Sequence, residues 1–241
     1  MKPYLSAFVA GLEARLRRGE HLALYGPRGS GKSTVLEAVH LRLAGRVPCA
    51  LSPSTRSLDD ITHALEHAYP DVDTHEIKRR SARSRLWRAA DEQRGVLLLD
   101  HLSDVSNAMV GFLRRLHGGV VGALSAVDVE RESDRWLMKS WRYGAMSVRM
   151  PLMPQTRLRK LLRARCTTLG LPSPDEDLER RVAHLARGRP GWIIQYTDLE
   201  RDSRYWRDGR LLVSVLCVDT EAAVRYQALE MLRPAVPFAP P

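Results

Sequence analysis

Cysteine is scarce in this chain, which has three cysteines among 241 residues. Cys49, Cys166 and Cys217 are scattered and show no C-x-x-C spacing, which argues against a disulfide framework and a cysteine zinc site. Long apolar runs are also missing, because no stretch approaches the roughly 20 residues of a membrane-spanning helix. The first residues mix Glu13 with arginines, unlike a secretion signal. We therefore expect a cytoplasmic protein with no membrane partner.

Lysine is the second scarcity, so the net charge of +10 comes almost entirely from arginine. The only lysines are Lys2, Lys32, Lys78, Lys139 and Lys160. A basic surface attracts the phosphate backbone of nucleic acids. An arginine excess can equally reflect genomic base composition, so charge alone leaves nucleic-acid contact open.

The most informative segment reads Gly26-Pro27-Arg28-Gly29-Ser30-Gly31-Lys32-Ser33, which has the spacing G-x-x-x-x-G-K-S. It lies between an apolar strand predicted at 21–25 and a helix predicted at 32–43, as a phosphate-binding loop must. Its glycines permit positive φ and close backbone approach, so successive N–H groups face the phosphates. We expect Lys32 to reach the β/γ-phosphates and Ser33 to hold Mg²⁺, with Thr34 beside them. A chance turn capping an ordinary helix is the alternative.

A second informative segment, residues 95–100, is an apolar run that ends in an acid. This pattern predicts a buried central strand that delivers a carboxylate to its C-terminal edge. In a phosphate-binding-loop protein, Asp100 is expected to bind Mg²⁺, usually through water.

The rest of the chain up to about residue 151 alternates between the sequence patterns of strands and of helices. An amphipathic helix is predicted at 3–18, and Ser57 is the expected cap of a later helix. The other predicted elements are strands at 47–51, 120–127 and 145–151, and helices at 57–69, 74–94, 107–117 and 133–141. Together they predict an α/β fold, a P-loop three-layer sandwich with about five parallel central strands.

After residue 155 the pattern becomes helical. Helices are predicted at 155–169, 176–187 and 192–199, then a hairpin over 204–218 with a turn at Asp208-Gly209, then a helix from Asp219 to Arg233. The predicted domains are a nucleotide-binding core at 1–153, a small helical lid at 154–200, a hairpin-plus-helix extension at 201–233, and a flexible proline-rich tail at 234–241.

The loop at 26–33, the strand ending in Asp100 and the helical lid give this chain a family resemblance. It resembles the AAA+ ATPases, and most of all the origin-recognition, transposon-helper and STAND-like branches, over about residues 1–200. The resemblance implies ATP or ADP with Mg²⁺ as cofactors. It also implies that Ser125 senses the γ-phosphate, the alternative being an ordinary strand hydroxyl. Arg142 matches the finger that reaches a neighbouring subunit's nucleotide, which implies a homo-oligomer; an idle surface arginine is the alternative.

Two positions depart from the family pattern. His101 stands where AAA+ enzymes carry a catalytic glutamate, and although imidazole can accept a proton from water, its charge and reach differ. Hydrolysis is therefore expected to be slow, or to use another group such as Asp104; a plain strand-end residue is the alternative for His101. In the lid, Gly191 replaces the family's sensor arginine, leaving Arg187 or Arg189 as substitutes.

Two basic helices complete the candidate features. The segment 78–88 carries Arg79, Arg80 and Arg83 and can meet phosphates, or it is a solvated face with Trp87 turned into the core. A second basic stretch lies at 157–165. The leading hypothesis is a slow, Mg-ATP-dependent switch that acts on DNA or a protein partner. The alternatives are a nucleotide-binding adaptor with little or no hydrolysis, and a P-loop kinase of a small acceptor.

Overall fold

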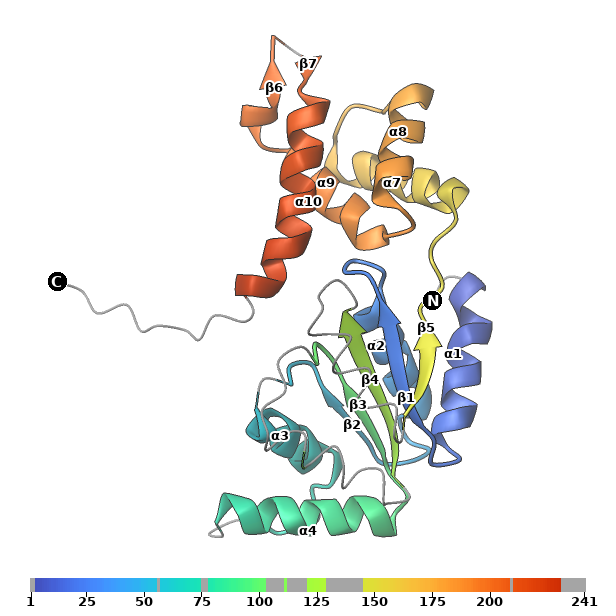
Figure 1. The fold of residues 1–241 in the computed structure, drawn as a ribbon, viewed down its shortest axis with the longest axis vertical. Helices are drawn as coiled ribbons and strands as arrows, with labels where there is room; N and C mark the ends of the chain where they lie inside the picture. The colour runs from blue at the N-terminus through green and yellow to red at the C-terminus, as the bar shows by residue number, and fades with distance from the viewer. Residues whose placement is uncertain are drawn as a thin grey trace, which may run out of the picture. The chain divides into compact units, whose positions relative to one another are not determined.

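The computed structural model describes residues 3–55, 57–74, 78–102, 111, 121–128, 145–208 and 210–230 (Figure 1). The chain forms two compact units. One comprises Met1–Gly26 and Lys32–Met150, and the other comprises Pro27–Gly31 and Pro151–Pro241. Within the described ranges, no helix combines the length and the apolar character needed to cross a membrane.

The first unit is built on a five-stranded sheet in the order β2-β3-β4-β1-β5. Its strands are β1 (His21–Gly26), β2 (Cys49–Ser52), β3 (Val96–Leu99), β4 (Gly122–Asp128) and β5 (Met146–Arg149). Every pair of neighbouring strands is parallel. The prediction of an α/β P-loop sandwich with five parallel strands is confirmed.

Helices cover both faces of this sheet, which explains why β3 is apolar throughout. Leu97 and Leu99 belong to a buried cluster with residues of α3 (Leu58–Ala68) and α4 (Arg79–Glu92). Val96 and Leu98 belong to a second cluster with residues of α1 (Pro3–Leu16) and α2 (Lys32–Leu43). Since successive side chains of a strand point to opposite faces, each face of β3 has its own hydrophobic layer.

Local signals set several of the boundaries. Ser57 caps α3 as predicted: its hydroxyl accepts from the Asp60 N–H, and the Asp60 carboxylate accepts from the Ser57 N–H. The helix predicted at 74–94 is observed as Arg79–Glu92, and residues 75–77 are not described. The helices predicted at 107–117 and 133–141 lie outside the described residues, apart from residue 111.

The second unit is a cluster of helices. It contains α7 (Gln155–Leu169), α8 (Glu176–Ala186), α9 (Pro190–Glu200) and α10 (Val213–Glu230), with a short hairpin of β6 (Trp206–Arg207) and β7 (Arg210–Leu211) before α10. Trp192 and Tyr196 are buried and stack on each other, with ring centroids 5.6 Å apart. Helix α9 begins at Pro190, before the predicted residue 192, because proline suits the first turn of a helix.

One prediction of secondary structure is wrong. The second strand of the hairpin ends at Leu211, and residues 213–218, predicted as strand, are the first turns of α10. Leu216, Thr220 and Val224 are buried at four-residue spacing, while Val218 is exposed. Packing of this apolar stripe against α9 outweighs the β-propensity of the valines. Residues 231–241, including the predicted tail, lie outside the described part of the chain.

Candidate nucleotide site

The phosphate-loop motif has the local structure that its sequence predicts. Strand β1 ends at Gly26, and α2 begins at Lys32. Between them, Gly29 and Gly31 adopt φ values of +72° and +96°, which side chains disfavour. The glycines thus let the backbone turn from strand to helix over residues 27–31, with the N-terminus of α2 as an anion-binding end.

Lys32 is 7% exposed, and its ammonium contacts polar groups of the first unit. Its ammonium donates to the Gly26 carbonyl oxygen at 2.9 Å and pairs with the Asp128 carboxylate at 2.6 Å. Sequence reasoning missed Asp128, because the strand was predicted to end at residue 127. The missed signal was an apolar strand that ends in an acid, the same pattern that identified Asp100.

Asp100 directly follows β3 and is buried. Its backbone N–H donates to the Ser52 carbonyl at 2.9 Å, and its carbonyl accepts from the Thr55 hydroxyl at 2.8 Å. These bonds fix the backbone that carries the carboxylate. Leu98 of β3 and Ala126 of β4 point to the face that α2 covers. Because side chains alternate along a strand, Asp100 and Asp128, two residues further on, project from this same face.

His101 contacts the carboxylate that it follows. Its backbone N–H donates to Asp100 Oδ1 at 2.9 Å, and its ring Nε2 lies 3.7 Å from Asp100 Oδ2. His101 has a φ of +51°, a left-handed conformation that is uncommon for non-glycine residues. The residue at the family's glutamate position is therefore folded back onto Asp100.

The other predicted site residues differ in their surroundings. Ser33 is half-buried on the first turn of α2, and Thr34 is exposed. Ser125 is completely buried within β4, on the face opposite Asp128, and its Oγ has no hydrogen-bond partner among the described residues. Arg142 and Asp104 lie outside the described residues. The structure therefore brings Lys32, Ser33 and Asp100 to one edge of the sheet.

These residues fit a magnesium-bound nucleotide by their chemistry. Mg²⁺ prefers oxygen ligands, and Ser33 and Asp100 offer a hydroxyl and a carboxylate. The glycine cradle offers backbone N–H groups to phosphate oxygens. Ser30, in the same loop, has a buried hydroxyl with no hydrogen-bond partner among the described residues. These residues therefore have the chemistry that such a ligand needs.

Within the second unit, Gly191 contacts the tip of the loop. The Gly191 N–H donates to the Gly29 carbonyl at 2.8 Å. A Cβ atom built on Gly191 would lie 2.8 Å from the Gly29 Cα, too close for any side chain without a backbone shift. The family's sensor arginine is therefore excluded at this position by the contact between two glycine backbones.

The two substitute arginines have different environments. Arg189 is buried, and its Nη1 and Nη2 donate to the Glu221 carboxylate of α10 at 3.2 and 2.7 Å. These bonds lower the pKa of Glu221, which also accepts from Trp192 Nε1 at 3.0 Å. Arg187 is exposed in a left-handed conformation that ends α8. Arg189 thus joins two helices, whereas Arg187 faces solvent.

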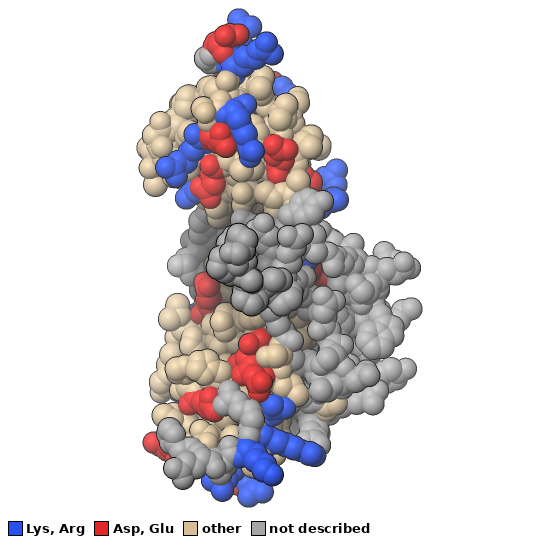
Figure 2. Space-filling model, turned by 90° about the vertical axis from the view of Figure 1, so that its left-hand side faces the viewer, with Lys and Arg blue, Asp and Glu red and all other residues tan. Residues whose placement is uncertain are grey.

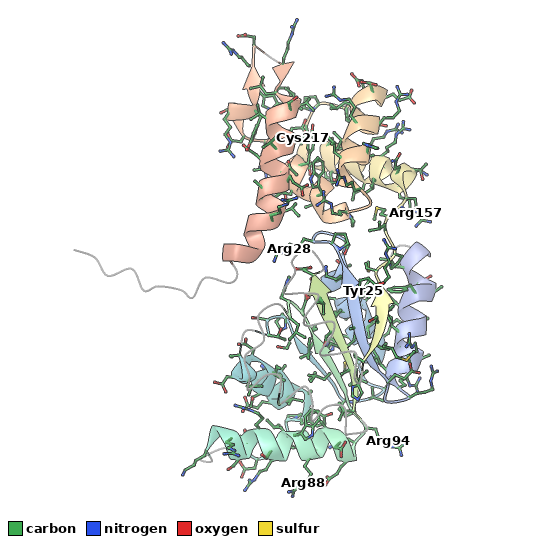
Figure 3. The ribbon with its side chains drawn as sticks, in the orientation of Figure 1. Tyr25, Arg28, Arg88, Arg94, Arg157 and Cys217 are labelled. Atoms are coloured by element: carbon green, nitrogen blue, oxygen red, sulfur yellow. The ribbon has the colours of Figure 1, made fainter. Side chains whose placement is uncertain are left out.

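Arg28 joins the same unit from within the loop. It is 9% exposed, and its Nη1 donates to the Arg225 carbonyl of α10 at 2.6 Å (Figure 3). The motif allows any residue at this position, so the sequence carried no signal for the contact. The loop tip 27–31 is consequently anchored to α9 and to α10.

Part of the basic face predicted on α4 is exposed. Arg80 and Arg88 are open to solvent, while Leu86 is fully buried and Trp87 packs against the core (Figure 3). Arg83 donates to Asp59 at 3.3 Å and is partly tied to α3. Figure 2 shows lysine and arginine side chains gathered at the end of the first unit where α4 lies.

Two of the cysteines are too strongly protonated for thiol chemistry. Burial raises the pKa of Cys49 to about 12 and that of Cys166 to about 11. Neither thiol ionises appreciably near neutral pH, so neither is a ready nucleophile. Within the described ranges, no group of three or more His, Cys, Asp or Glu side chains could hold a metal ion.

Comparison with protein families gives a match over the first unit. Residues 15–128 match the family model described as an AAA domain. This match supports the resemblance of the chain to the AAA+ P-loop ATPases. The matched region includes the loop at 26–33, Asp100 and Asp128. A search of curated proteins gave no match.

Solved structures extend the likeness to residues of both units of this chain. Cdc6p from Pyrobaculum aerophilum is 17% identical with a TM-score of 0.55, and the match covers 82% of this chain and 61% of that one. Orc1 of Aeropyrum pernix, solved with DNA, is 16% identical with a TM-score of 0.58, covering 98% and 70%. A Walker-type ATPase of Pyrococcus abyssi is 16% identical with a TM-score of 0.61, covering 97% and 76%. At these identities the likeness shows the fold, and this chain spans 61% of the Cdc6p length.

Proposed function

We propose that this chain is an AAA+-type ATPase that binds Mg-ATP at Gly26–Ser33 and Asp100 and acts as a slow, nucleotide-dependent switch. The observation that carries the proposal is the common sheet edge shared by Lys32, Ser33 and Asp100, next to a glycine loop with positive φ. In α/β proteins, ligands bind outside the carboxyl ends of parallel strands.

Each residue has an assigned part in this proposal. The backbone N–H groups of 27–33 bind phosphate oxygens, with Thr34 beside them, and Lys32 neutralises the β/γ-phosphates. Ser33 and Asp100 hold the magnesium ion, which spreads the charge that develops during phosphoryl transfer. The family resemblance makes Ser125 the γ-phosphate sensor, but its hydroxyl is buried on the face of β4 opposite Asp128 and Asp100. Arg142 is the proposed finger that acts on a neighbouring copy.

Slow turnover follows from two features. His101 replaces the family's glutamate and contacts Asp100, and its charge and reach differ from those of a glutamate. Gly191 contacts Gly29 and cannot carry a sensor arginine, while Arg189 is committed to Glu221. The same two features also favour the second candidate, an adaptor that binds nucleotide without hydrolysing it.

Nucleic acid is the proposed partner of the basic face on α4. Arg80 and Arg88 are exposed there, and each phosphate contact would contribute to a salt-dependent affinity. The similar Orc1 protein of Aeropyrum pernix was solved in complex with DNA, which supports the same direction. The family resemblance is also consistent with two other partners, which are further copies of this chain assembled through Arg142 and a different protein.

The test compares ATP turnover, with and without duplex DNA, in the parent protein, Lys32→Ala and His101→Glu. The switch predicts slow turnover that DNA stimulates, that Lys32→Ala abolishes and that His101→Glu accelerates. The adaptor predicts no turnover in the parent and measurable turnover only in His101→Glu. Nucleotide binding that is unchanged in Lys32→Ala would contradict both.

A further inference from the structure

The partner of the loop lysine is the feature that the proposed function leaves unexplained. Lys32 is 7% exposed, and its ammonium lies 2.6 Å from the Asp128 carboxylate, which is 15% exposed. A cation this deeply buried needs a partner, because an unpaired buried charge is strongly unfavourable. Asp128 supplies that partner from the next strand of the sheet.

The sheet register fixes this pair. Strands β1 and β4 are parallel neighbours, and Gly26 aligns with Asp128. The Lys32 side chain reaches back from the start of α2 to the Gly26 carbonyl at 2.9 Å, so its ammonium arrives beside the end of β4. Asp128 projects to the α2 face together with Leu124 and Ala126, which pack in the same cluster as α2. The contact is therefore built into the fold.

Phosphate binding at Lys32 has a consequence for Asp128. A phosphate oxygen that approaches the ammonium comes close to the carboxylate already paired with it. Two negative groups at such short range repel each other, and they compete for the same N–H donors. The Asp128 carboxylate therefore opposes the binding of a β- or γ-phosphate to Lys32.

We propose that Asp128 is a built-in competitor for Lys32, which weakens binding of nucleotides that carry a β-phosphate and so sets the nucleotide concentration at which the switch responds. The inference rests on the proposed nucleotide binding. It assigns to Asp128 a role distinct from that of Asp100, because Asp128 opposes the ligand through the lysine and Asp100 supports it through the metal.

Binding measurements with three ligands test this competition. The affinities of ATP, ADP and AMP are measured by calorimetry for the parent, Asp128→Asn and the charge-matched control Glu20→Gln. Glu20 pairs with Arg15 and Arg18 just before β1 and has no part in the site. We expect Asp128→Asn to bind ATP and ADP roughly tenfold more tightly. AMP, which lacks the phosphates that Lys32 contacts, should bind equally to all three proteins.

The contrary results are distinct. A parent that binds ADP while Asp128→Asn binds it equally well or more weakly overturns the competition alone. A loss of affinity confined to solutions with Mg²⁺ would assign Asp128 to the metal and also overturns it. A parent that binds none of the three nucleotides overturns the proposed function, and the inference falls with it.

A second measurement needs no nucleotide. Thermal unfolding is compared among Lys32→Met, Asp128→Asn and the double variant, since each single change leaves the other group buried without its partner. We expect the melting temperature of the double variant to fall by less than the two single variants' decreases added together. Additive losses would show that the pair is not coupled and would overturn the inference even if Asp128→Asn proves too unstable for calorimetry.

Discussion

Two arginine-rich helices, α4 in the first unit and α7 in the second, look alike in sequence and differ in structure. On α7, two arginines donate to the Glu179 carboxylate of α8. Arg159 donates through Nε at 3.1 Å, and Arg163 donates through Nη2 at 2.6 Å. On α4, Arg80 and Arg88 are exposed and form no ion pair with a described residue. A basic run is therefore a phosphate-binding candidate only where the fold leaves its charges unpaired.

The second unit also buries acids, and their environments separate them. Glu179 is buried between two arginines, and hydrogen bonds from Arg163 and Arg159 lower its pKa. Glu200 is also buried, and the loss of solvation raises its pKa from 4.5 to about 7. One buried acid thus stabilises the helices as a carboxylate, and the other destabilises them in that form.

The greatest change in stability is expected from the titration of Glu200. Because its folded-state pKa is the higher one, stability is greatest below 4.5 and falls as the pH rises to about 7. The loss amounts to at most about 3 kcal/mol. Glu200→Gln should remove this slope, so urea unfolding at pH 5 and pH 8 is compared in parent and variant. If the free energy of unfolding changes equally with pH in the parent and in Glu200→Gln, then Glu200 is solvated in the folded protein.

The next effect concerns the partner of the α7 arginines. Glu179→Gln removes the charge that pairs with Arg159 and Arg163 and should lower the free energy of unfolding by about 2 kcal/mol. As the pH falls below 4.5, the difference from the parent should shrink, because Glu179 becomes protonated there. The control is Asp198→Asn, which removes the half-exposed partner of Arg165 and should change stability by about 0.5 kcal/mol or less. If both variants lose a similar free energy of unfolding, burial does not determine how much these ion pairs contribute to stability.

The exposed arginines of α4 should contribute least to stability. Arg80→Ser and Arg88→Ser should each change the free energy of unfolding by less than about 0.5 kcal/mol. If α4 contacts DNA, each variant should weaken binding and reduce the slope of log affinity against log salt by about 1. Arg163→Ser on α7 should instead lower stability and leave the salt slope unchanged. The opposite pattern would assign the nucleic-acid surface to α7.

Much of the first unit follows from its sequence because the signals there are local. The loop glycines, the Ser57 cap and the apolar run before Asp100 each depend on neighbouring residues. The Lys32–Asp128 pair could not be predicted, since it depends on which strand lies beside β1. The same holds for Gly191, whose contact with Gly29 joins residues far apart in the chain. Residues 213–218 were predicted wrongly because their valine content favours a strand. The helix is stabilised by packing of Leu216, Thr220 and Val224 against α9, which the local sequence does not reveal.

The proposed function depends above all on whether Gly26–Ser33 and Asp100 form a working Mg-ATP site. Calorimetric titration of ATP, with and without Mg²⁺, tests this in the parent, Lys32→Ala, Asp100→Asn and the exposed control Arg94→Ala. We predict that Lys32→Ala weakens binding more than roughly tenfold, about 1.4 kcal/mol, that Asp100→Asn removes the magnesium dependence, and that Arg94→Ala matches the parent. Equal affinity in all four proteins, with or without magnesium, would contradict the assignment.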